Sequence, residues 1–270
     1  MTGLEETVGD IIADIDAVLL FTERDEFYDR FEETEKPVVV VAEENTVNAE
    51  NFVLLPLKFT DVNGRIRFGL EGALDNDFIE PDNEVVCLTQ SFDEDRLDTV
   101  VRVKADEFTE TGVYDLFVNS RPDADVVRDV FEVAIDLGKK GQKGKQVGAL
   151  FVVGDAGKVM NKSRPLSYNP FEKSHVHVGD PIVNVMLKEF SRLDGAFVIS
   201  DSGKIVSAYR YLEPAAEGVD IPKGLGARHM AAGAITRDTN AVAIVLSESD
   251  AMVRAFKAGE LILELDPEEY

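Results

Sequence analysis

Residues 37–42 read Pro37-Val38-Val39-Val40-Val41-Ala42, a short apolar run that predicts a buried strand. Similar runs recur through the first half of the chain, at residues 17–21, 52–55, 85–88 and 100–103. The stretch from Glu23 to about Glu33, between the first two runs, is expected to be helical. Near-continuous β-branched runs separated by helices favour a mainly parallel sheet covered on both faces. We therefore predict a small α/β domain over residues 1–110.

The second half of the chain predicts a mixed sheet packed against helices. Strands are expected at residues 147–153, 197–200, 205–208 and 241–246, and helices at residues 180–190 and 227–237. The turn Asp201-Ser202-Gly203-Lys204 predicts a hairpin between two of these strands. An earlier helix, residues 123–137, has apolar residues at helical spacing and is expected to end at Gly138. The predicted fold class is α/β throughout, with residues 111–140 as a helical connector into the second domain.

The charge of the chain is distributed unevenly. The 270 residues carry 52 Asp and Glu against 28 Lys and Arg, a formal net charge of −24. Residues 1–136 hold 35 of these acidic and 11 of these basic side chains, whereas residues 137–270 hold 17 of each. Such acidity repels nucleic acid and anionic membranes, so we expect neither as a partner. A salt-rich cytoplasm and an acidic docking surface would each explain it.

Cysteine usage and hydropathy point to a cytoplasmic protein. Cys87 is the one cysteine, so no disulfide can form within the chain. Its apolar neighbours predict a buried strand and an inert thiol. No apolar run approaches the roughly 18 residues that a membrane-spanning helix needs. The acidic N-terminus has no signal-peptide pattern.

Two short segments of the second half carry residues suited to phosphate chemistry. Asp194-Gly195-Ala196 puts a carboxylate before an apolar run. This carboxylate is either a cap for backbone N–H groups or a ligand for a metal that activates a hydroxyl group. Gly226-Ala227-Arg228-His229-Met230 puts a cation and a histidine where a loop enters a helix, and the free N–H groups of a helix N-terminus favour an anion. An Arg-His pair is structural in most proteins, and the glycine-containing loop before it strengthens the alternative of phosphate binding without displacing the structural interpretation.

Other candidate motifs carry less weight. His175 and His177 would share one face of a strand, a spacing compatible with a metal site. No third ligand follows at a suitable spacing, so surface or core-edge histidines are the favoured interpretation. The chain has no Gly-x-Ser-x-Gly motif, Walker-type loop, cysteine cluster or dinucleotide-binding fingerprint.

Taken in order, several segments resemble the diadenylate cyclase domain. They are Gly148-Ala149-Leu150-Phe151-Val152-Val153-Gly154-Asp155, Asp194-Gly195-Ala196-Phe197-Val198-Ile199, Tyr211-Leu212-Glu213-Pro214, Ile221-Pro222, Gly226-Ala227-Arg228-His229 and Ser247-Glu248. The resemblance covers about residues 121–265. With an α/β domain before it, the layout is similar to that of the archaeal cyclases, whose N-terminal domain resembles the C-terminal domain of pyruvate kinase.

The resemblance implies that two ATP molecules are condensed to cyclic di-AMP and two pyrophosphates, with Mn²⁺ or Mg²⁺ as cofactor. It implies a homo-oligomer in which the sites of two subunits face each other, and the 3′-hydroxyl group of each ATP attacks the α-phosphate of the other. The implied roles are metal binding and hydroxyl orientation by Asp194, backbone approach to the nucleotide at Gly195, phosphate binding by Arg228 and His229, adenine packing by Leu212, and nucleotide contacts from Gly226, Ala227, Ser247 and Glu248.

Some positions depart from the family pattern. Many members carry Gly-Thr-Arg-His-Arg, whereas here Ala227 replaces the threonine and Met230 the second arginine. Ser249 follows Ser247-Glu248 where relatives often have a basic residue. These losses motivate the alternative of a catalytically weak or inactive nucleotide-binding regulatory module. A third hypothesis makes the N-terminal domain the working part, as a docking or ligand-sensing unit. Because Asp194, Arg228 and His229 remain, an active cyclase is the favoured prediction.

Overall fold

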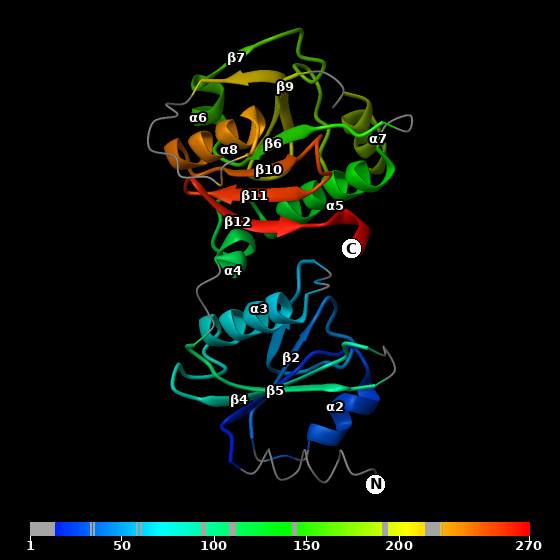
Figure 1. Cartoon of the computed structure of the whole chain (residues 1–270), viewed down its shortest axis with the longest axis vertical. Helices are drawn as coiled ribbons and strands as arrows, with labels where there is room; N and C mark the ends of the chain where they lie inside the picture. The colour runs from blue at the N-terminus through cyan, green and yellow to red at the C-terminus, as the bar shows by residue number, and fades with distance from the viewer. Residues whose placement is uncertain are drawn as a thin grey trace. The chain divides into compact units, whose positions relative to one another are not determined.

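The computed structural model describes residues 14–270, except for residues 33, 35, 58, 60, 93–95, 108–111, 142–144, 191–193, 214–221 and 223. The chain divides into two compact units, Met1–Tyr114 and Asp115–Tyr270, each built around its own sheet (Figure 1). Some predicted features, namely the helix end at Glu33, the turn at residues 191–193, Pro214 and Ile221, lie outside the described residues.

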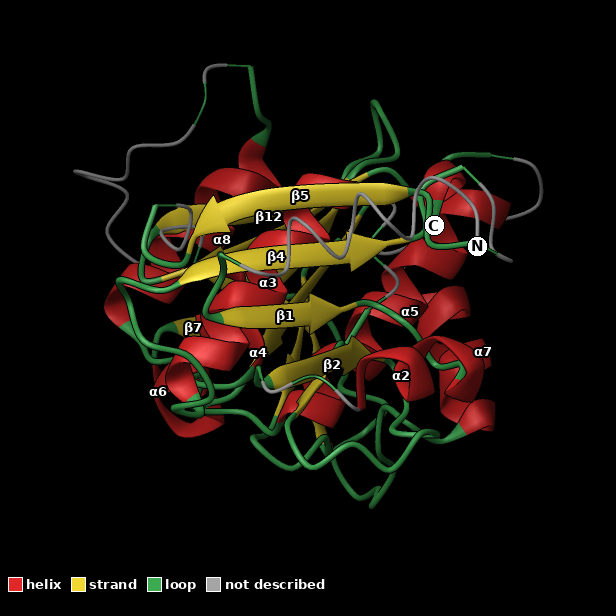
Figure 2. Ribbon diagram, turned by 90° about the horizontal axis from the view of Figure 1, so that it is seen from below, coloured by secondary structure: helices red, strands yellow, loops and turns green. Residues whose placement is uncertain are grey.

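The N-terminal unit is built on a mainly parallel sheet (Figure 2). Its described strands are β1 (Ala17–Leu20), β2 (Val38–Ala42), β3 (Phe52–Leu54), β4 (Glu84–Thr89) and β5 (Thr99–Lys104). They lie in the order β3-β2-β1-β4-β5, and β5 alone among them pairs antiparallel, with β4. The predicted mainly parallel sheet is confirmed.

Helices cover both faces of this sheet. The helices that begin in this unit are α2 (Asp25–Glu32), α3 (Val62–Asp75) and α4 (Val113–Phe117). Phe31 of α2 packs on the face that carries Val18. α3 packs on the other face, where a Cβ atom at Gly69 would lie 2.8 Å from the Phe21 ring. The sequence did not predict α3, because glycines lower helix propensity; here glycine lets the helix approach the sheet closely.

Cys87 lies in the middle of β4, as predicted for a core thiol. Its side chain is fully buried. Burial raises the pKa of the thiol to about 12, because the thiolate would lose its hydration. The thiol therefore stays protonated and has little nucleophilic character at neutral pH.

The C-terminal unit is built on a mixed sheet in the order β12-β11-β10-β6-β8-β9-β7. Its described strands are β6 (Ala149–Val153), β7 (Ser163–Pro165), β8 (Ala196–Ile199), β9 (Ile205–Leu212), β10 (Val242–Leu246), β11 (Val253–Lys257) and β12 (Glu260–Leu265). β6 and β8 pair in parallel, and the remaining described pairs are antiparallel. The predicted mixed sheet and the β8–β9 hairpin are confirmed, whereas β7, β11 and β12 were not predicted.

Helices of the C-terminal unit pack on this sheet. They are α5 (Ala124–Lys140), α6 (Ala156–Asn161), α7 (Pro181–Phe190), α8 (Ala227–Asp238) and the 3₁₀ turn η1 (Pro267–Glu269). α7 and α8 occupy the stretches predicted to be helical, and α6 begins where a simple turn was expected. Across the described parts of both units, every helix is too short or too polar to cross a membrane.

The predicted helix end at Gly138 is wrong. α5 continues through Gly138 to Lys140 and ends at Gly141, whose φ of +54° is a conformation that glycine adopts without strain. A Cβ atom at Gly138 would lie 2.6 Å from Cγ of Pro267. Gly138 therefore serves close packing between α5 and η1, not helix termination.

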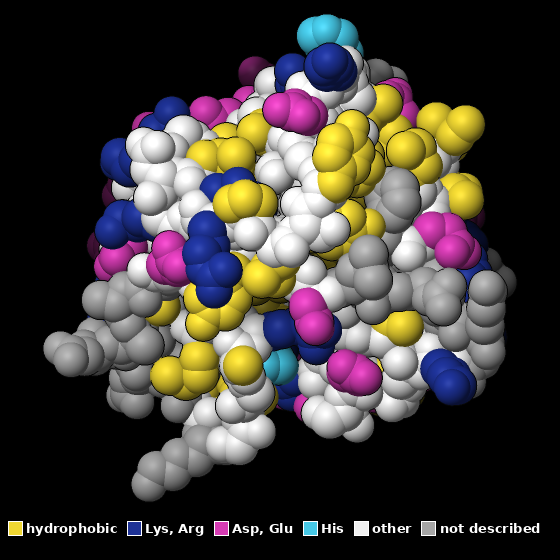
Figure 3. Space-filling model, turned by 90° about the horizontal axis from the view of Figure 1, so that it is seen from above, with side chains coloured by type: hydrophobic (Ala, Val, Ile, Leu, Met, Phe, Trp, Pro, Cys, Tyr) yellow, Lys and Arg dark blue, Asp and Glu magenta, His cyan; other side chains and the backbone are white. Residues whose placement is uncertain are grey.

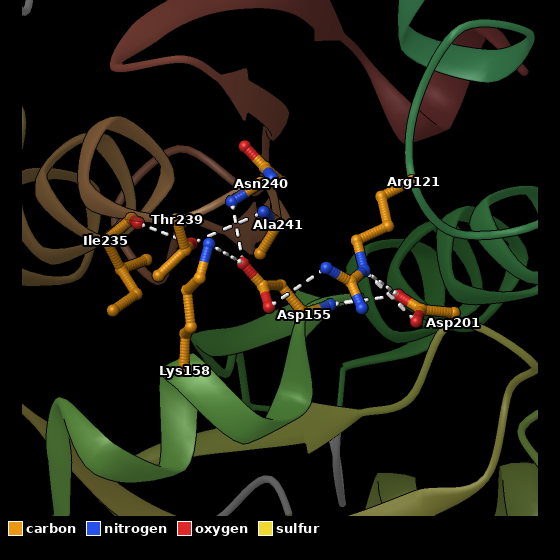
Figure 4. A network of polar contacts seen from close by, with 8 residues as sticks. All are labelled: Arg121, Asp155, Lys158, Asp201, Ile235, Thr239, Asn240 and Ala241. Atoms are coloured by element: carbon orange, nitrogen blue, oxygen red, sulfur yellow. Dashed lines mark hydrogen bonds and ion pairs between the residues drawn. The ribbon is translucent and has the colours of Figure 1, made fainter.

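A polar cluster joins the carboxyl ends of β6 and β8 to the start of β10 (Figure 4). The Asp155 carboxylate, 5% exposed, lies 3.2 Å from the Arg121 guanidinium and 3.3 Å from Nζ of Lys158. It also accepts a hydrogen bond from the backbone N–H of Asn240. Burial alone would raise the pKa of Asp155, but these hydrogen bonds and cations lower it below its ordinary value. Ion pairs and hydrogen bonds of Asp155 therefore connect the elements at this end of the sheet.

Candidate functional site

A pocket of about 680 Å³ lies at the opposite end of the same strands. The pocket lies where β6 and β8 begin, where β9 and β10 end, and at the N-terminus of α8. Every residue that the sequence predicted for the site lines this pocket: Asp194, Gly195, Leu212, Gly226, Ala227, Arg228, His229, Ser247 and Glu248. Segments up to 54 positions apart are thus brought to one place by the sheet, since Asp194 and Glu248 share the pocket wall.

Arg228 links carboxylates that belong to different elements. Its Nη1 atom donates a hydrogen bond to Oε2 of Glu248 at 3.3 Å, and its Nη2 atom lies 3.7 Å from Oδ1 of Asp194. A Cβ atom at Gly148 would lie 2.7 Å from Nη1, so glycine at that position makes room for the guanidinium. Asp194 is 93% exposed and Glu248 64% exposed, which leaves both carboxylates open to a ligand.

The N-terminus of α8 faces the pocket without a side-chain cap. Gly226 is the N-cap residue, and its side chain offers no oxygen to the first N–H groups of the helix. Gly224, two positions earlier, has a φ of +101° and turns the loop into the helix. Unpaired N–H groups and the helix dipole both favour an anion at this point. The glycine-containing loop that the sequence predicted at a helix N-terminus is confirmed.

His229 is buried beside the guanidinium of Arg254. Its Nε2 atom lies 3.5 Å from Nη1 of Arg254, and its Nδ1 atom is buried without a hydrogen-bond partner among the described residues. Burial and the neighbouring cations of Arg254 and Arg228 lower the pKa of His229, while Asp250 and Glu264 oppose this shift. A neutral ring that accepts from Arg254 at Nε2 carries its proton on Nδ1. That proton has no acceptor among the described residues.

Arg254 holds His229 in place and was not predicted from the sequence. Its side chain is 7% exposed and forms ion pairs with Asp250 at 2.8 Å and Glu264 at 2.5 Å. Hydrogen bonds from Arg254 and Ser247 hold the pKa of Asp250 well below its usual range. The feature of the sequence that could have indicated this role is an arginine between the apolar residues of the mostly buried strand β11.

Gly195 is required by the chain itself. Its φ is +108°, and a Cβ atom there would lie 2.7 Å from the backbone of Tyr209 on β9. The register between β8 and β9 is irregular next to it, and Tyr209 also has a positive φ of 56°. The glycine therefore lets β9 cross close to the start of β8, beside Asp194.

Residues to which the sequence analysis assigned no role in the site complete the wall. They are Leu150, Leu166, Ala196, Arg210, Tyr211, Ala231, Leu246 and Ser249. Arg210 is nearly buried, and its guanidinium donates to the backbone carbonyl groups of Met160 and Ser163. Arg210 thus connects β9 to the end of α6 and the start of β7. Leu212 is 9% exposed and contributes an apolar surface next to it.

His175 and His177 do not belong to this pocket. Both are exposed, and His177 forms an isolated bridge with Lys204, not a strand with His175. Within the described ranges, no group of three His, Cys, Asp or Glu side chains could hold a metal ion. The interpretation of His175 and His177 as surface histidines is consistent with this geometry.

The donor set of the pocket fits a divalent cation shared with a phosphorylated ligand. Mg²⁺ is held in many proteins by one or two carboxylates together with substrate phosphates and waters, and carboxylate and water ligands also suit Mn²⁺. Asp194 provides an exposed carboxylate at the pocket wall. His229 does not suit a metal, because the Arg254 cation lies beside its Nε2 atom.

Comparisons with known proteins agree with this geometry. A family model described as "Diadenylate cyclase, N-terminal" matches residues 1–125, and one described as "DisA bacterial checkpoint controller nucleotide-binding" matches residues 137–261. A protein of Haloferax volcanii named "Diadenylate cyclase" is 69% identical over 270 residues, which span all of both chains. A protein of the same name from Methanocaldococcus jannaschii is 37% identical over 225 residues, 82% of this chain and 72% of its own. A third, from Listeria monocytogenes, is 34% identical over 88 residues, 33% of this chain and 32% of its own.

Proposed function

This chain belongs to the diadenylate cyclase family, and we propose that it condenses two ATP molecules into cyclic di-AMP and two pyrophosphates. The observation that carries this proposal is the single pocket that collects Asp194, the N-terminus of α8 with Arg228 and His229, and the Ser247-Glu248 pair. Phosphoryl transfer needs in-line positioning and charge neutralisation more than covalent help, and these groups supply both.

Each residue of the pocket has a separate role in binding or positioning ATP. Arg228 and the free N–H groups of α8 bind phosphate oxygens, and neutral His229 donates its Nδ1 proton to another. Gly226 and Ala227 let the phosphates approach the helix backbone. Asp194 accepts the 3′-hydroxyl proton or orients that hydroxyl group toward the α-phosphate. The apolar side chain of Leu212 packs on adenine, and Ser247 and Glu248 line the triphosphate end.

Asp194 is the residue we assign to the metal. Mn²⁺ or Mg²⁺ would add positive charge at the phosphate oxygens and favour the ionised hydroxyl group. The Arg228 guanidinium lies 3.7 Å from Asp194, so a cation borders the carboxylate that would hold the metal. Glu248 is paired with Arg228 and completes the acidic side of the pocket.

We propose further that one pocket is half of a working site and that a second copy of the chain supplies the other half. Each chain offers one set of these groups, whereas the reaction joins two ATP molecules. Leu166 and Tyr211 line the pocket and are 44% and 50% exposed, which leaves apolar surface at its mouth. The space-filling view shows apolar side chains exposed between basic and acidic ones on one face (Figure 3). Such a mixed surface suits contact between identical subunits.

The domain limits belong to the same proposal. We assign catalysis to residues 121–265, with residues 111–140 as the helical connector that includes the first helix of the catalytic domain, and residues 1–110 to a separate acidic domain. The compact unit Asp115–Tyr270 and the match at residues 137–261 support this assignment. We also infer a cytoplasmic location, supported by the single reduced cysteine and by ATP as substrate.

The test is an assay of the full chain with ATP and Mn²⁺ or Mg²⁺, with products separated by chromatography. We expect cyclic di-AMP from the wild type and a loss of at least about 100-fold for Asp194→Asn, because several kcal/mol of charge stabilisation disappear. The melting temperature should not change, since Asp194 is 93% exposed. Asp125→Asn is the matched control, because Asp125 is an exposed carboxylate on α5 that does not line the pocket.

The absence of cyclic di-AMP from the wild type at every salt and metal concentration would reject the cyclase. Calorimetric binding of ATP without turnover would then support the alternative of a nucleotide-binding regulatory module. Ala227 and Met230, where relatives have threonine and arginine, are the positions to restore in that case.

A further inference from the structure

The N-terminal unit contains a second pocket, of about 670 Å³, that the proposed catalytic function does not use. Its wall is formed where β1, β2 and β4 end and where α3 begins, by residues such as Phe21, Thr22, Ala42, Arg65 and Gln90. β2 and β4 lie on either side of β1. The connection after β1 therefore leads to one side of this strand, and the later connection into β4 leads to its other side. In open parallel sheets, ligands bind outside the carboxyl ends of strands at such a switch point.

Arg65 is the residue of this pocket whose guanidinium has a buried N–H group without an acceptor among the described residues. It lies in the first turn of α3, where the helix dipole disfavours a cation. Its guanidinium lies 5.9 Å from the centre of the Phe21 ring and donates one described hydrogen bond, from Nη2 to the carbonyl group of Gln90 at 2.8 Å. Its Nε atom is buried without a hydrogen-bond partner in the described structure. Burial lowers the pKa of Arg65, although Asp98 and Asp61 oppose this shift.

Buried polar atoms without a partner are rare in folded proteins and call for an explanation. Within the described residues, three side-chain atoms are in this state: Nδ1 of His229, Nε of Arg65 and Oγ1 of Thr89. His229 lines the proposed catalytic pocket. Arg65 lines the second pocket, and Thr89 ends β4 directly before Gln90 of the same wall. Both pockets therefore hold donors that the chain itself leaves unused.

Two acidic residues, Glu23 and Glu43, line this pocket, and the carboxylate of Glu23 is already engaged. Oε1 of Glu23 accepts hydrogen bonds from the backbone N–H groups of Glu43 and Glu44, at 3.1 and 3.2 Å. Thr46 donates to the backbone carbonyl group of Glu23. Glu23 thus fixes the loop that follows β2 and shapes the pocket without pairing with Arg65.

We propose that the N-terminal unit binds a small organic oxyanion in this pocket, with the Arg65 guanidinium as the group that receives the phosphate or carboxylate. The side chains of Phe21, Val41 and Leu55 offer an apolar wall for the body of the molecule. The volume lies within the range of small-molecule sites, about 300–1,000 Å³. The unit has 29 Asp and Glu against 9 Lys and Arg, so it repels anions in general and needs a built site to hold one.

The experiment is calorimetry on the full chain with three probes at constant ionic strength: phenyl phosphate, benzoate and inorganic phosphate. We expect saturable binding of phenyl phosphate or benzoate, tighter than that of inorganic phosphate, because the ring adds apolar contact. The tighter of the two aromatic probes identifies the oxyanion as phosphate or carboxylate. Arg65→Met should weaken binding by at least about 10-fold, the effect of losing a charged hydrogen bond.

Two variants serve as controls for position and charge. Arg67→Met removes an exposed arginine from the same helix and should leave binding unchanged. Arg228→Met removes a cation from the catalytic pocket, where phosphate probes can also bind. Binding that remains in Arg228→Met and is weakened by Arg65→Met belongs to the N-terminal pocket, which separates this proposal from the cyclase. If Arg65→Met does not fold, judged by circular dichroism, Arg65→Lys keeps the charge, removes the planar fork and should weaken binding.

Several results would overturn the proposal. One is the absence of saturable binding of any probe up to about 10 mM, the weak end expected for fragments of this size. Another is unchanged binding in the folded Arg65 variant. Loss of binding in Arg228→Met with retention in Arg65→Met would place the anion in the catalytic pocket and would equally reject the site.

Discussion

His229 shows how a single residue of the pocket depends on its neighbours. Burial and the Arg254 cation favour the neutral ring and lower its pKa in the folded chain. The unfolded chain therefore takes up the proton more readily. The stability due to neutral His229 is present above the unfolded pKa of about 6.5 and is lost as the pH falls through the folded value.

Replacing Arg254 should reverse much of this shift. In Arg254→Met the repelling cation is gone while Asp250 and Glu264 remain, so we expect the pKa of His229 to rise. NMR titration of the histidine ring measures it directly. Arg237→Met, at the other end of α8, is the control and should leave the titration unchanged. An unaltered pKa in Arg254→Met would mean that burial alone sets the protonation state.

The residues of the site were predictable in part. Asp194 stood out because it precedes Gly195 and an apolar run, and Arg228 and His229 because they follow a glycine-containing loop at a helix start. All three line the pocket. Arg254 and Arg210 did not stand out, because a cation inside a strand has no local pattern that reveals its partner. Arg254 meets His229 across 25 positions of sequence, a contact that only the packing of α8 on the sheet creates.

At the level of elements, glycines decide how closely helices pack. Gly138 lies in the interior of α5, where a Cβ atom would meet Pro267 at 2.6 Å. Gly157 lies in α6, where a Cβ atom would meet nothing within 4 Å. The same residue type therefore has a packing role in one helix and none in the other.

The two glycines should respond oppositely to alanine. Gly138→Ala should lower the free energy of unfolding by about 1–3 kcal/mol, because the proline ring cannot move aside cheaply. Gly157→Ala should raise it by up to about 1 kcal/mol, because alanine favours the helix. Urea unfolding with an unchanged m-value measures both. Equal effects would show that the contact with Pro267 does not govern the packing of α5.

Elements with strong hydrophobic periodicity were predicted well, and weakly patterned ones were missed. α5, α8 and the strands β1, β2, β4, β6, β8 and β10 agree with the runs read from the sequence. α3 was missed because Gly69 and Gly72 weaken its helical pattern. β11 was missed because Arg254 and Lys257 shorten its apolar run, and β12 because charged and partly exposed positions interrupt its run. The pairing of β11 with β10 and of β12 with β11 places both strands in the sheet.

At the level of the whole molecule, the two units differ in net charge. Met1–Tyr114 holds 29 acidic and 9 basic side chains, whereas Asp115–Tyr270 holds 23 and 19. Like charges on one unit repel each other in the folded state, and salt screens this repulsion. The N-terminal unit should therefore depend more on salt than the C-terminal unit.

Hydrogen exchange at low and high KCl tests this expectation. Between about 0.1 M and 1 M, where the Debye length falls from about 10 Å to about 3 Å, amides of β1, β2 and β4 should gain more protection than amides of β6, β8 and β10. The C-terminal strands serve as the internal control. An equal gain in both units would show that net charge does not set the salt dependence.

Dilution tests the half-site arrangement. If a second copy completes each site, the rate of cyclic di-AMP formation per chain should fall as the chain is diluted below the dissociation constant of the assembly. Initial rates and the mass in solution are measured over the same concentration series. A constant rate per chain at concentrations where the mass is that of a monomer would contradict the proposal.

The sequence by itself determined the α/β class, the buried strands, the charge asymmetry and the identity of the residues around Asp194 and Arg228, because periodicity, composition and glycine-flanked motifs are local properties. The tertiary structure decided that these residues line one pocket, that Arg254 keeps His229 neutral and that Arg65 faces a second pocket. Those facts depend on strand order and on helices packing across a sheet. Contacts between distant segments arise from burial of the whole core, which no short stretch of sequence specifies.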